Sequence, residues 1–210
     1  MKYDLHVHSK YSSDGFVEPE KIVKTAEKIG LAGIAITDHD TIKGGLMAKK
    51  FKTENVEVIV GCEVTSTQGE IIGLFLNQEI KSNNHVEVMD EIKAQDGVVV
   101  IPHPFDTMRK ATYRPRQDYI KYLDCIEVFN SRCITQKYNE QAKSFANKYN
   151  LNTCAGSDAH FINEIGNAGV IIENDLKKSL KNNKVEIFGR KSSILNHGLT
   201  KIVKMYRKSG

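Results

Sequence analysis

The stretch Lys2-Tyr3-Asp4-Leu5-His6-Val7-His8, close to the start of the chain, decides how the rest of the sequence is interpreted. Its alternating pattern predicts a β-strand, and on a strand every second side chain points to the same face. His6 and His8 therefore lie side by side. Two neighbouring imidazoles are half of a typical metal shell, so we expect a metal site at the end of this strand.

Four later motifs contain similar groups, and each directly follows a β-like run. They are Thr37-Asp38-His39-Asp40, Gly61-Cys62-Glu63, Pro102-His103-Pro104 and Ser157-Asp158-Ala159-His160. Together with the first strand they hold five of the seven histidines. Taken singly, each motif has a simpler interpretation as a surface histidine, a helix cap or a rigid turn. Their joint placement at strand ends is what favours metal chemistry.

Strand-like and helix-like segments alternate between these motifs. Strands are expected at 2–8, 31–36, 56–60, 70–76, 98–101, 125–129, 152–155, 170–172 and 185–188, and helices at 19–29, 44–51, 86–95, 135–149, from 175 and from 199. Such alternation indicates an α/β fold with parallel strands and helical crossovers. In an open doubly wound sheet the ligands would gather at one switch point, whereas here they follow nearly every strand. We therefore expect a barrel with its site at the C-terminal ends of the strands.

Length and composition indicate one domain spanning residues 1–210. The chain is 40% apolar and 27% charged, and its net charge of +4 suits an anionic substrate without requiring a nucleic acid. It has no apolar run of about 18 residues and no signal-peptide core, so we expect a cytoplasmic protein without a membrane partner. Its cysteines lack metal or disulfide spacing and are expected to be packed thiols: Cys62, Cys125, Cys133 and Cys154.

The motifs, in their order and spacing, resemble the PHP family (polymerase and histidinol phosphatase). The resemblance covers nearly the whole chain and includes Glu127-Val128-Phe129-Asn130. Family members are metal-dependent phosphoesterases on a distorted seven-stranded, TIM-like β/α barrel. Within the family the sequence looks most like small stand-alone members related to nucleoside 3′,5′-bisphosphate phosphatases. The resemblance therefore implies a hydrolase, specifically a phosphatase.

The resemblance also implies a trinuclear centre of divalent ions, which would be zinc, manganese or iron. The first ion would be held by His6, His8, Glu63 and Asp158, the second by Glu63 and His103, and the third by Asp14, His39 and His160. Many members have a histidine where this chain has Glu70, which we expect to ligate the second ion through oxygen. Catalytic roles are assigned to Glu63, Asp158 and His160.

The residue types agree with this interpretation independently of the family. Imidazole nitrogens and carboxylate oxygens without thiolate suit zinc, manganese or iron better than calcium. A cluster with excess positive charge binds a phosphate and lowers the pKa of a bridging water. The expected reaction is hydrolysis of a phosphomonoester, with a small nucleotide-like substrate, by a metal-bridging hydroxide.

Three residues are predicted to bind the substrate: Arg132, Asn130 and Arg109. Arginine forks match phosphate oxygens. Glu127 lies in strand 125–129 and Asn130 directly follows it, and of the two Asn130 is better placed to contact the substrate. The last helix carries an apolar stripe (Leu199, Ile202, Val203 and Tyr206) that predicts packing on the barrel.

Two other functions stay open at this stage. The same metals would serve an exonuclease or oligoribonuclease acting on phosphodiesters, so a nucleic-acid partner is possible although a small phosphorylated substrate is favoured. A non-catalytic metal-binding interaction module is the third alternative. The sequence does not address the oligomeric state.

Overall fold

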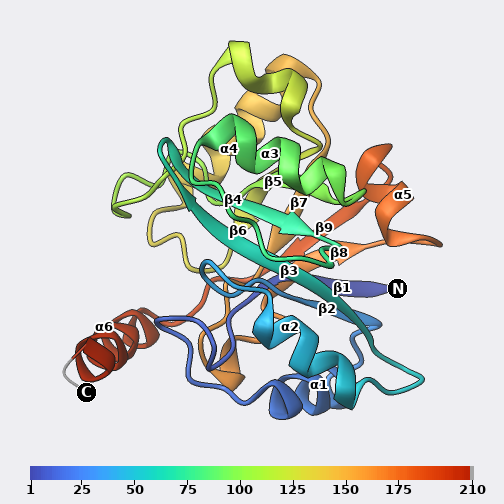
Figure 1. The fold of residues 1–210 in the computed structure, drawn as a ribbon, viewed down its shortest axis with the longest axis vertical. Helices are drawn as coiled ribbons and strands as arrows, with labels where there is room; N and C mark the ends of the chain where they lie inside the picture. Colours follow the sequence, from blue (N-terminus) through green and yellow to red (C-terminus); the bar gives the residue numbers. More distant parts are fainter. Residues whose placement is uncertain (209–210) are drawn as a thin grey trace.

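The computed structural model describes residues 1–208, with side chains up to residue 205, as a curved mixed sheet covered by helices (Figure 1). The strands are β1 (Lys2–Val7), β2 (Gly33–Ile36), β3 (Glu57–Ser66), β4 (Gly69–Leu74), β5 (Val98–Ile101), β6 (Cys125–Asn130), β7 (Thr153–Gly156), β8 (Ala168–Ile171) and β9 (Glu186–Gly189). The α-helices are α1 (Pro19–Lys28), α2 (Lys43–Ala48), α3 (His85–Ala94), α4 (Gln136–Tyr149), α5 (Leu176–Lys181) and α6 (Ile194–Lys208). Short 3₁₀ helices occupy Lys49–Phe51, Gln117–Tyr122 and Ile162–Glu164.

The sheet order is β7-β6-β5-β4-β3-β2-β1-β8-β9, and the sheet curls into a nearly closed barrel. The segment after β7 closes it, because Ala159 pairs in parallel with Val7 of β1. His8 donates its backbone N–H to the Ala159 carbonyl at 2.8 Å. The predicted barrel is therefore confirmed, although the described residues form nine strands rather than the seven that the resemblance implied.

The alternation of strands with helices had predicted parallel strands, but some of the strands are antiparallel. β4 runs antiparallel to both β3 and β5, and β8 runs antiparallel to β1 and β9. The reason for the first reversal is local: only Thr67 and Gln68 separate β3 from β4, and so short a connection permits a hairpin but not a crossover. Gly69 has φ +126° with the Tyr113 backbone close by, a place that only glycine fills without strain.

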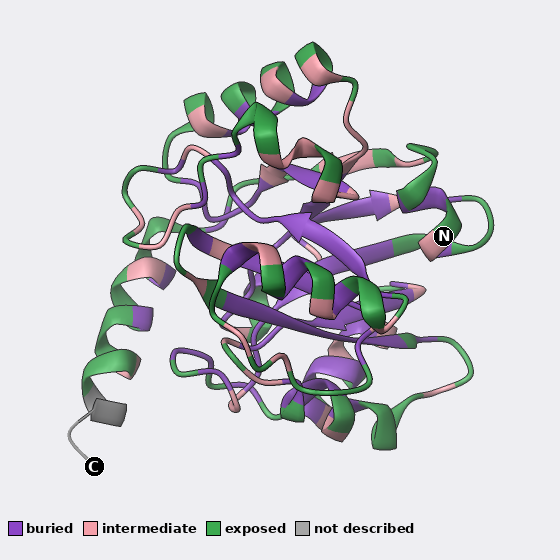
Figure 2. Ribbon diagram, turned by 45° about the horizontal axis from the view of Figure 1, so that its top comes forward, coloured by how far each residue is buried: buried purple, intermediate pink, exposed green. Residues whose placement is uncertain are grey.

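Apolar periodicity explains where the helices lie. In α1, Pro19 occupies the first turn and Ile22, Val23 and Ala26 are buried on one stripe. In Figure 1, α1 and α2 cover one side of the strands, while α3 and α4 cover the opposite side. β5 is buried along its whole length, as a strand covered on both faces should be. Figure 2 shows this buried interior surrounded by exposed helix surfaces.

Helix α6 differs from its prediction in both extent and orientation. It begins at Ile194 rather than near Leu199, and it lies at the edge of the barrel instead of packing along it (Figure 1). Leu199 and Ile202 of the expected packing stripe are exposed, whereas Asn196 and Thr200 are buried. The helix thus turns a polar face toward the barrel; Val203 is partly buried and the Tyr206 side chain lies outside the described residues. No described helix is both long and apolar enough to cross a lipid bilayer.

Candidate metal centre

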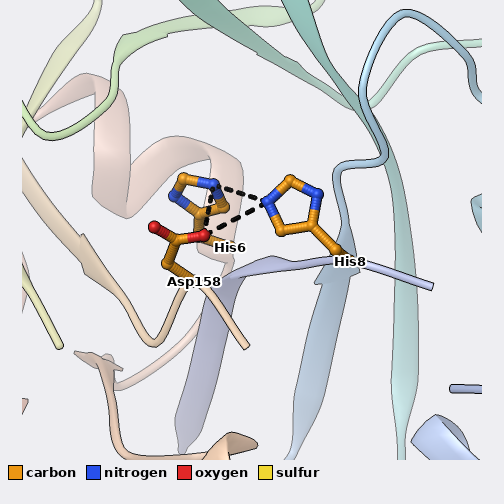
Figure 3. A group of neighbouring side chains, drawn as sticks. All are labelled: His6, His8 and Asp158. Atoms are coloured by element: carbon orange, nitrogen blue, oxygen red, sulfur yellow. Dashed lines mark hydrogen bonds and ion pairs between the residues drawn. The ribbon is translucent and has the colours of Figure 1, made fainter. Parts of the chain in front are cut away.

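The first strand delivers two buried imidazoles to the C-terminal mouth of the barrel. The Nε2 atoms of His6 and His8 lie 3.2 Å apart, and each side chain is about 1% exposed. Asp158 Oδ1 approaches them at 3.6 Å and 3.3 Å respectively (Figure 3). Three ligand-type atoms therefore face one another, as the alternation of β1 had predicted.

Asp158 and His103 reach the site from backbone in the left-handed region. Their φ values are +56° and +28°, which side chains other than glycine rarely adopt. Each lies two residues beyond the end of a strand, Asp158 beyond β7 and His103 beyond β5. Backbone strain of this kind persists where the surrounding structure holds the residue in place, and it is frequent at functional sites.

Glu63, near the middle of β3, lies between two groups of histidines. Its Oε1 is 2.9 Å from His103 Nε2, while its Oε2 is 3.3 Å from the Nε2 atoms of both His6 and His8. The two oxygens thus face different neighbours, which is the arrangement that a bridging carboxylate requires. Glu63 is 1% exposed.

A third group forms around Asp14. Its Oδ2 lies 3.3 Å from His39 Nε2 and 3.1 Å from His160 Nε2. The loop that carries Asp14 begins at Ser9, and Asp38 accepts hydrogen bonds from the backbone N–H and hydroxyl of Ser9 at 2.5 and 2.7 Å. Asp38 therefore holds this loop in place.

Glu70 of β4 also points toward the cluster. Its carboxylate oxygens lie 3.9 Å from His39 Nδ1 and 3.7 Å from His103 Nε2. Burial, together with the negative charge of Glu63, raises the pKa of Glu70. The structure thus brings all nine predicted metal ligands to one place, including Glu70.

These residues fit a cluster of divalent cations. Four overlapping groups have ligand atoms within 4.8 Å of one another: His6–His8–Asp158, His6–Glu63–His103, His8–His39–Glu63 and His8–Asp14–His160. Among the described residues, Asp158 Oδ1 and His103 Nδ1 are buried without a hydrogen-bond partner. A buried acceptor left unpaired is costly, and a cation beside Asp158 Oδ1 would satisfy it.

The charges of the site depend strongly on one another. Burial opposes protonation of His8, yet the neighbouring carboxylates of Asp158 and Glu63 raise its pKa to about 10. Burial likewise opposes ionisation of Asp158, but Arg109 and His6 hold the pKa of Asp158 well below its usual range. In the absence of metal these shifts favour protons on His6 and His8 beside an ionised Asp158. Divalent ions would have to displace those protons.

Glu127 of β6 orients two of the histidines, although the sequence ranked it below Asn130. Its Oε1 lies 3.1 Å from His6 Nδ1, and its Oε2 accepts the backbone N–H of His103 at 2.7 Å. Glu127 is 2% exposed. The sequence did contain a sign of this role, because Glu127 is an acidic residue within the otherwise apolar first half of β6.

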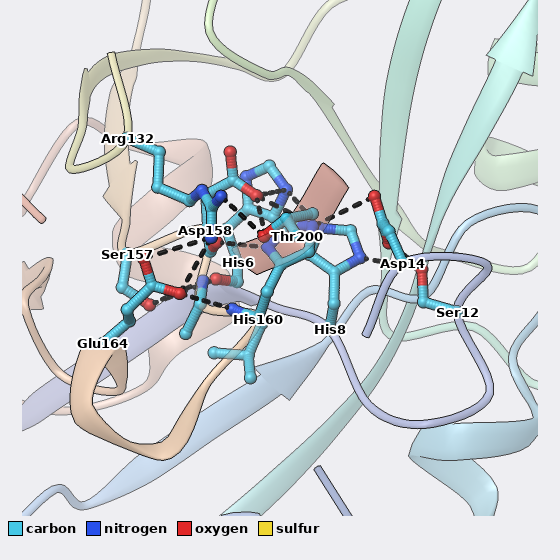
Figure 4. A network of polar contacts seen from close by, with 12 residues as sticks. His6, His8, Ser12, Asp14, Arg132, Ser157, Asp158, His160, Glu164 and Thr200 are labelled. Carbon is cyan, nitrogen blue, oxygen red and sulfur yellow. Dashed lines mark hydrogen bonds and ion pairs between the residues drawn. The ribbon is translucent and has the colours of Figure 1, made fainter. Parts of the chain in front are cut away.

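The three predicted substrate residues lie around the cluster but differ in their partners. Arg109 Nη2 is 2.5 Å from Asp158 Oδ2 and also donates to Asn130. Asn130 Nδ2 donates to both Glu127 and Asp158. Arg132, in contrast, pairs with Glu164 at 2.8 Å and donates to the Thr200 hydroxyl at 2.9 Å (Figure 4). Arg109 and Arg132 both line a cavity of about 260 Å³ beside the cluster.

Lys204 of α6 is a contact that the sequence did not predict. Its Nζ lies 2.8 Å from Asp14 Oδ2. Lys204 lies opposite the apolar stripe that was expected to pack on the barrel, and no motif surrounds it. Only the position of α6 in the fold brings it to the site.

Several proteins are similar to this chain in sequence. Two uncharacterised proteins of Methanocaldococcus jannaschii are 44% and 36% identical over 143 and 174 residues, covering 62% and 80% of this chain and 82% and 69% of their own lengths. A 5′-3′ exoribonuclease of Haemophilus influenzae is 30% identical over 68% of this chain and 58% of its own.

Solved structures share the fold at low sequence identity. A two-domain protein of Bacteroides vulgatus, described as containing a predicted PHP-like metal-dependent phosphoesterase, has a TM-score of 0.76 at 20% identity over 90% of this chain. This chain spans 65% of that protein's length. A protein of Bifidobacterium adolescentis described as a predicted metal-dependent phosphoesterase has a TM-score of 0.64 at 19% identity, over 76% of this chain and 87% of its own.

The family assignment rests on the sequence profile of the PHP domain, which matches residues 4–168. This range contains all nine clustered histidines and carboxylates and ends at the start of β8. The chain belongs to the PHP domain family.

Proposed function

We propose that this protein is a metal-dependent phosphatase that hydrolyses a small phosphomonoester, with a nucleotide-like substrate favoured. The observation that carries the proposal is the convergence of nine buried or partly buried nitrogen and oxygen ligands beside arginine side chains. When bound, divalent ions would activate water, polarise the phosphate and stabilise the leaving oxygen. His6, His8, Glu63 and Asp158 would hold the first ion, Glu63, Glu70 and His103 the second, and Asp14, His39 and His160 the third.

The chain's own residues would prepare the ligands for this reaction. If His6 donates its Nδ1 proton to Glu127 at 3.1 Å, its Nε2 lone pair faces the cluster. His160 donates Nδ1–H in the same way to the Asp158 carbonyl at 2.8 Å, which leaves its Nε2 free to ligate. Arg109 would then exchange its contact with Asp158 for the substrate phosphate, because arginine forks match phosphate oxygens.

A protein nucleophile is not needed for this reaction. All four cysteines are buried. Burial raises the pKa values of Cys125 and Cys133, and those of Cys62 and Cys154 are raised for the same reason. A buried protonated thiol is a poor nucleophile, so the ligand cluster is left as the reactive centre.

The test is release of inorganic phosphate from a panel of phosphomonoesters with added manganese. Asp158→Asn and His8→Ala are expected to lose turnover because each removes a ligand that the first ion would share. His85→Gln is the matched control, since His85 lies outside the cluster beside Tyr119. Phosphate release by both ligand variants at the wild-type rate would overturn the proposal.

The second candidate is a nuclease acting on short oligonucleotides. Similarity to the Haemophilus exoribonuclease favours it, and the same ions would activate water toward a phosphodiester. A labelled trinucleotide distinguishes the two functions. Loss of a terminal phosphate alone supports the phosphatase, whereas a ladder of shorter products supports the nuclease.

A further inference from the structure

Helix α6 lies outside the family profile, which ends at residue 168, and yet it forms one wall of the cavity beside the cluster. The wall consists of His197, Thr200, Lys201 and Lys204, and it faces Asp14 and His160. This helix therefore brings groups to the site that the PHP barrel itself does not provide.

A buried chain of contacts holds α6 over the site. Glu164, which is fully buried, pairs with Arg132, and Arg132 donates to the Thr200 hydroxyl. Figure 4 shows Thr200, Arg132 and Glu164 among the side chains next to the cluster. Residues four apart share one face of a helix, so anchoring Thr200 directs Lys204 toward the same side.

Lys204 contacts the oxygen that an ion would use. Asp14 Oδ2 is the atom that faces His39 and His160, and it is also the atom 2.8 Å from Lys204 Nζ. Asp14 is 2% exposed, whereas the Lys204 side chain is 47% exposed and reaches in from the solvent side. An ammonium group and a divalent ion repel each other at such range, so the two would exclude each other from this oxygen.

We infer that Lys204 is a mobile cation of the site. It neutralises Asp14 when the third divalent ion is absent. When that ion binds, the ammonium group is displaced into the cavity, where it binds the phosphate of the substrate together with Arg109. This second role rests on the proposed phosphatase function; the first does not.

The first role is tested without any turnover, by calorimetric titration of manganese into metal-free protein. In Lys204→Met no ammonium group has to be displaced, so the manganese site at Asp14, His39 and His160 should bind about threefold to tenfold more tightly than in wild type. Lys204→Arg should keep the wild-type affinity because it keeps the charge. Lys201→Met is the matched control, since Lys201 makes no ion pair with a ligand within the described residues. Equal manganese affinity in Lys204→Met and wild type would overturn the competition.

The second role is tested on the metal-loaded enzyme with the substrate found in the phosphatase screen. Lys204→Met should raise KM at least about fivefold with little change in kcat, because a phosphate contact outside the reacting bonds is lost. An unchanged KM would overturn phosphate binding by Lys204. Failure of the proposed function would look different, since neither wild type nor variant would then release phosphate while the manganese titrations would still differ.

Discussion

A single buried carboxylate can fix the orientation of more than one histidine in this cluster. Glu127 binds the ring of His6 and the backbone of His103 at the same time. Orienting partners of this kind fix the tautomer and rotation of a ligand ring. The ligand set therefore depends on a residue that we do not expect to touch metal.

Replacing Glu127 should weaken metal binding without unfolding the protein. In Glu127→Gln the charge that holds His6 Nδ1–H is lost, so we expect about a tenfold to hundredfold loss of manganese affinity. Calorimetric titration measures it. Glu140→Gln on the exposed face of α4 is the control and should bind as wild type does. Wild-type affinity in Glu127→Gln would show that the contact does not orient His6.

Arg132 is expected to matter more for stability than its predicted substrate role suggests. Arg132→Met leaves Glu164, which is fully buried, without its ion-pair partner. Loss of one member of a buried pair costs about 3–5 kcal/mol of unfolding free energy. Urea unfolding measures this loss, and a Glu164→Met change in the same chain should recover part of it.

A matched control for Arg132 is the exposed pair of Arg116 and Asp118, whose side chains are 69% and 70% exposed. Arg116→Met should leave stability nearly unchanged, because exposed ion pairs contribute little. If Arg132→Met were as stable as Arg116→Met, the Arg132–Glu164 pair would not be a stabilising contact. Arg132 would then be free to serve the substrate as the sequence predicts.

The residues that the sequence identified differ physically from those it missed. His39 and His160 sit in short motifs at strand ends, and a motif can be seen without the fold. Lys204 lies 190 residues from Asp14 in the chain, and only the tertiary position of α6 pairs them. Glu127 was visible as an acidic residue in a buried strand, but its two partners were not.

At the level of elements, helix α2 supports the loop that carries Asp14. A Cβ on Gly44 would lie 1.8 Å from Asp38 Oδ2 and 2.3 Å from Ser9 Oγ. Gly44→Ala should therefore break the contact between Asp38 and Ser9, destabilise the protein by about 1–3 kcal/mol and weaken the Asp14 site. Thermal unfolding and manganese titration measure the two effects.

Gly198 of α6 provides the opposite case. A Cβ there meets nothing within 4 Å. Because alanine favours helix over glycine by about 1 kcal/mol, Gly198→Ala should protect α6 from hydrogen exchange rather than expose it. A loss of stability in Gly198→Ala, or none in Gly44→Ala, would contradict this account of the two glycines.

The docking of α6 should weaken in acid because of His197. Burial, followed by the positive charges of Arg132 and Arg109, lowers the pKa of His197 to about 4, below its usual value of about 6.5 in a free helix. A lowered pKa means that the docked position is fully stable above about pH 6.5 and loses stability as pH falls toward 4.

Hydrogen exchange of α6 in metal-free protein, expressed as protection factors at pH 5 and pH 7, checks this expectation. Protection should fall at pH 5 in wild type. His197→Gln, which cannot be protonated, should remove the difference between the two pH values. Equal protection in wild type at both values would contradict a docked, neutral His197.

Helices and strands were predictable where apolar residues recur at the spacing typical of that element. β5 and α1 follow directly from their buried runs. The direction of β4 does not follow from its apolar residues, because the same residues would suit a parallel or an antiparallel strand. The short Thr67-Gln68 turn makes β4 antiparallel to β3. The orientation of α6 was also hidden, because Leu199 and Ile202 form a stripe that normally marks a buried face.

For the molecule as a whole, the centre joins strands from both halves of the barrel. Ions bound between β1, β3 and the segments after β5 and β7 would stabilise the folded chain over the unfolded one. Manganese added to metal-free protein should raise the unfolding temperature by several degrees, measured by calorimetry. The rise should persist in His85→Gln and shrink in Asp158→Asn. An equal rise in both variants would indicate that the ion binds elsewhere.

The barrel itself was predictable because the candidate ligands followed nearly every strand, and only a closed sheet brings so many strand ends together. Its nine-strand order was not, since β8 and β9 carry no ligand and their antiparallel pairing with β1 leaves no mark in the motifs.

The closure of β1 against Ala159 also has a consequence for biosynthesis. The first strand made by the ribosome meets β2 early, but the Ala159 segment that closes the barrel against it emerges some 150 residues later, which is about 8–30 s at ordinary elongation rates. During that interval the half-built barrel has an open edge, and His6 and His8 lack Asp158. The complete set of candidate ligands is therefore assembled only after His160 has been synthesised, and until then the unpaired strand edge is exposed to association with other chains.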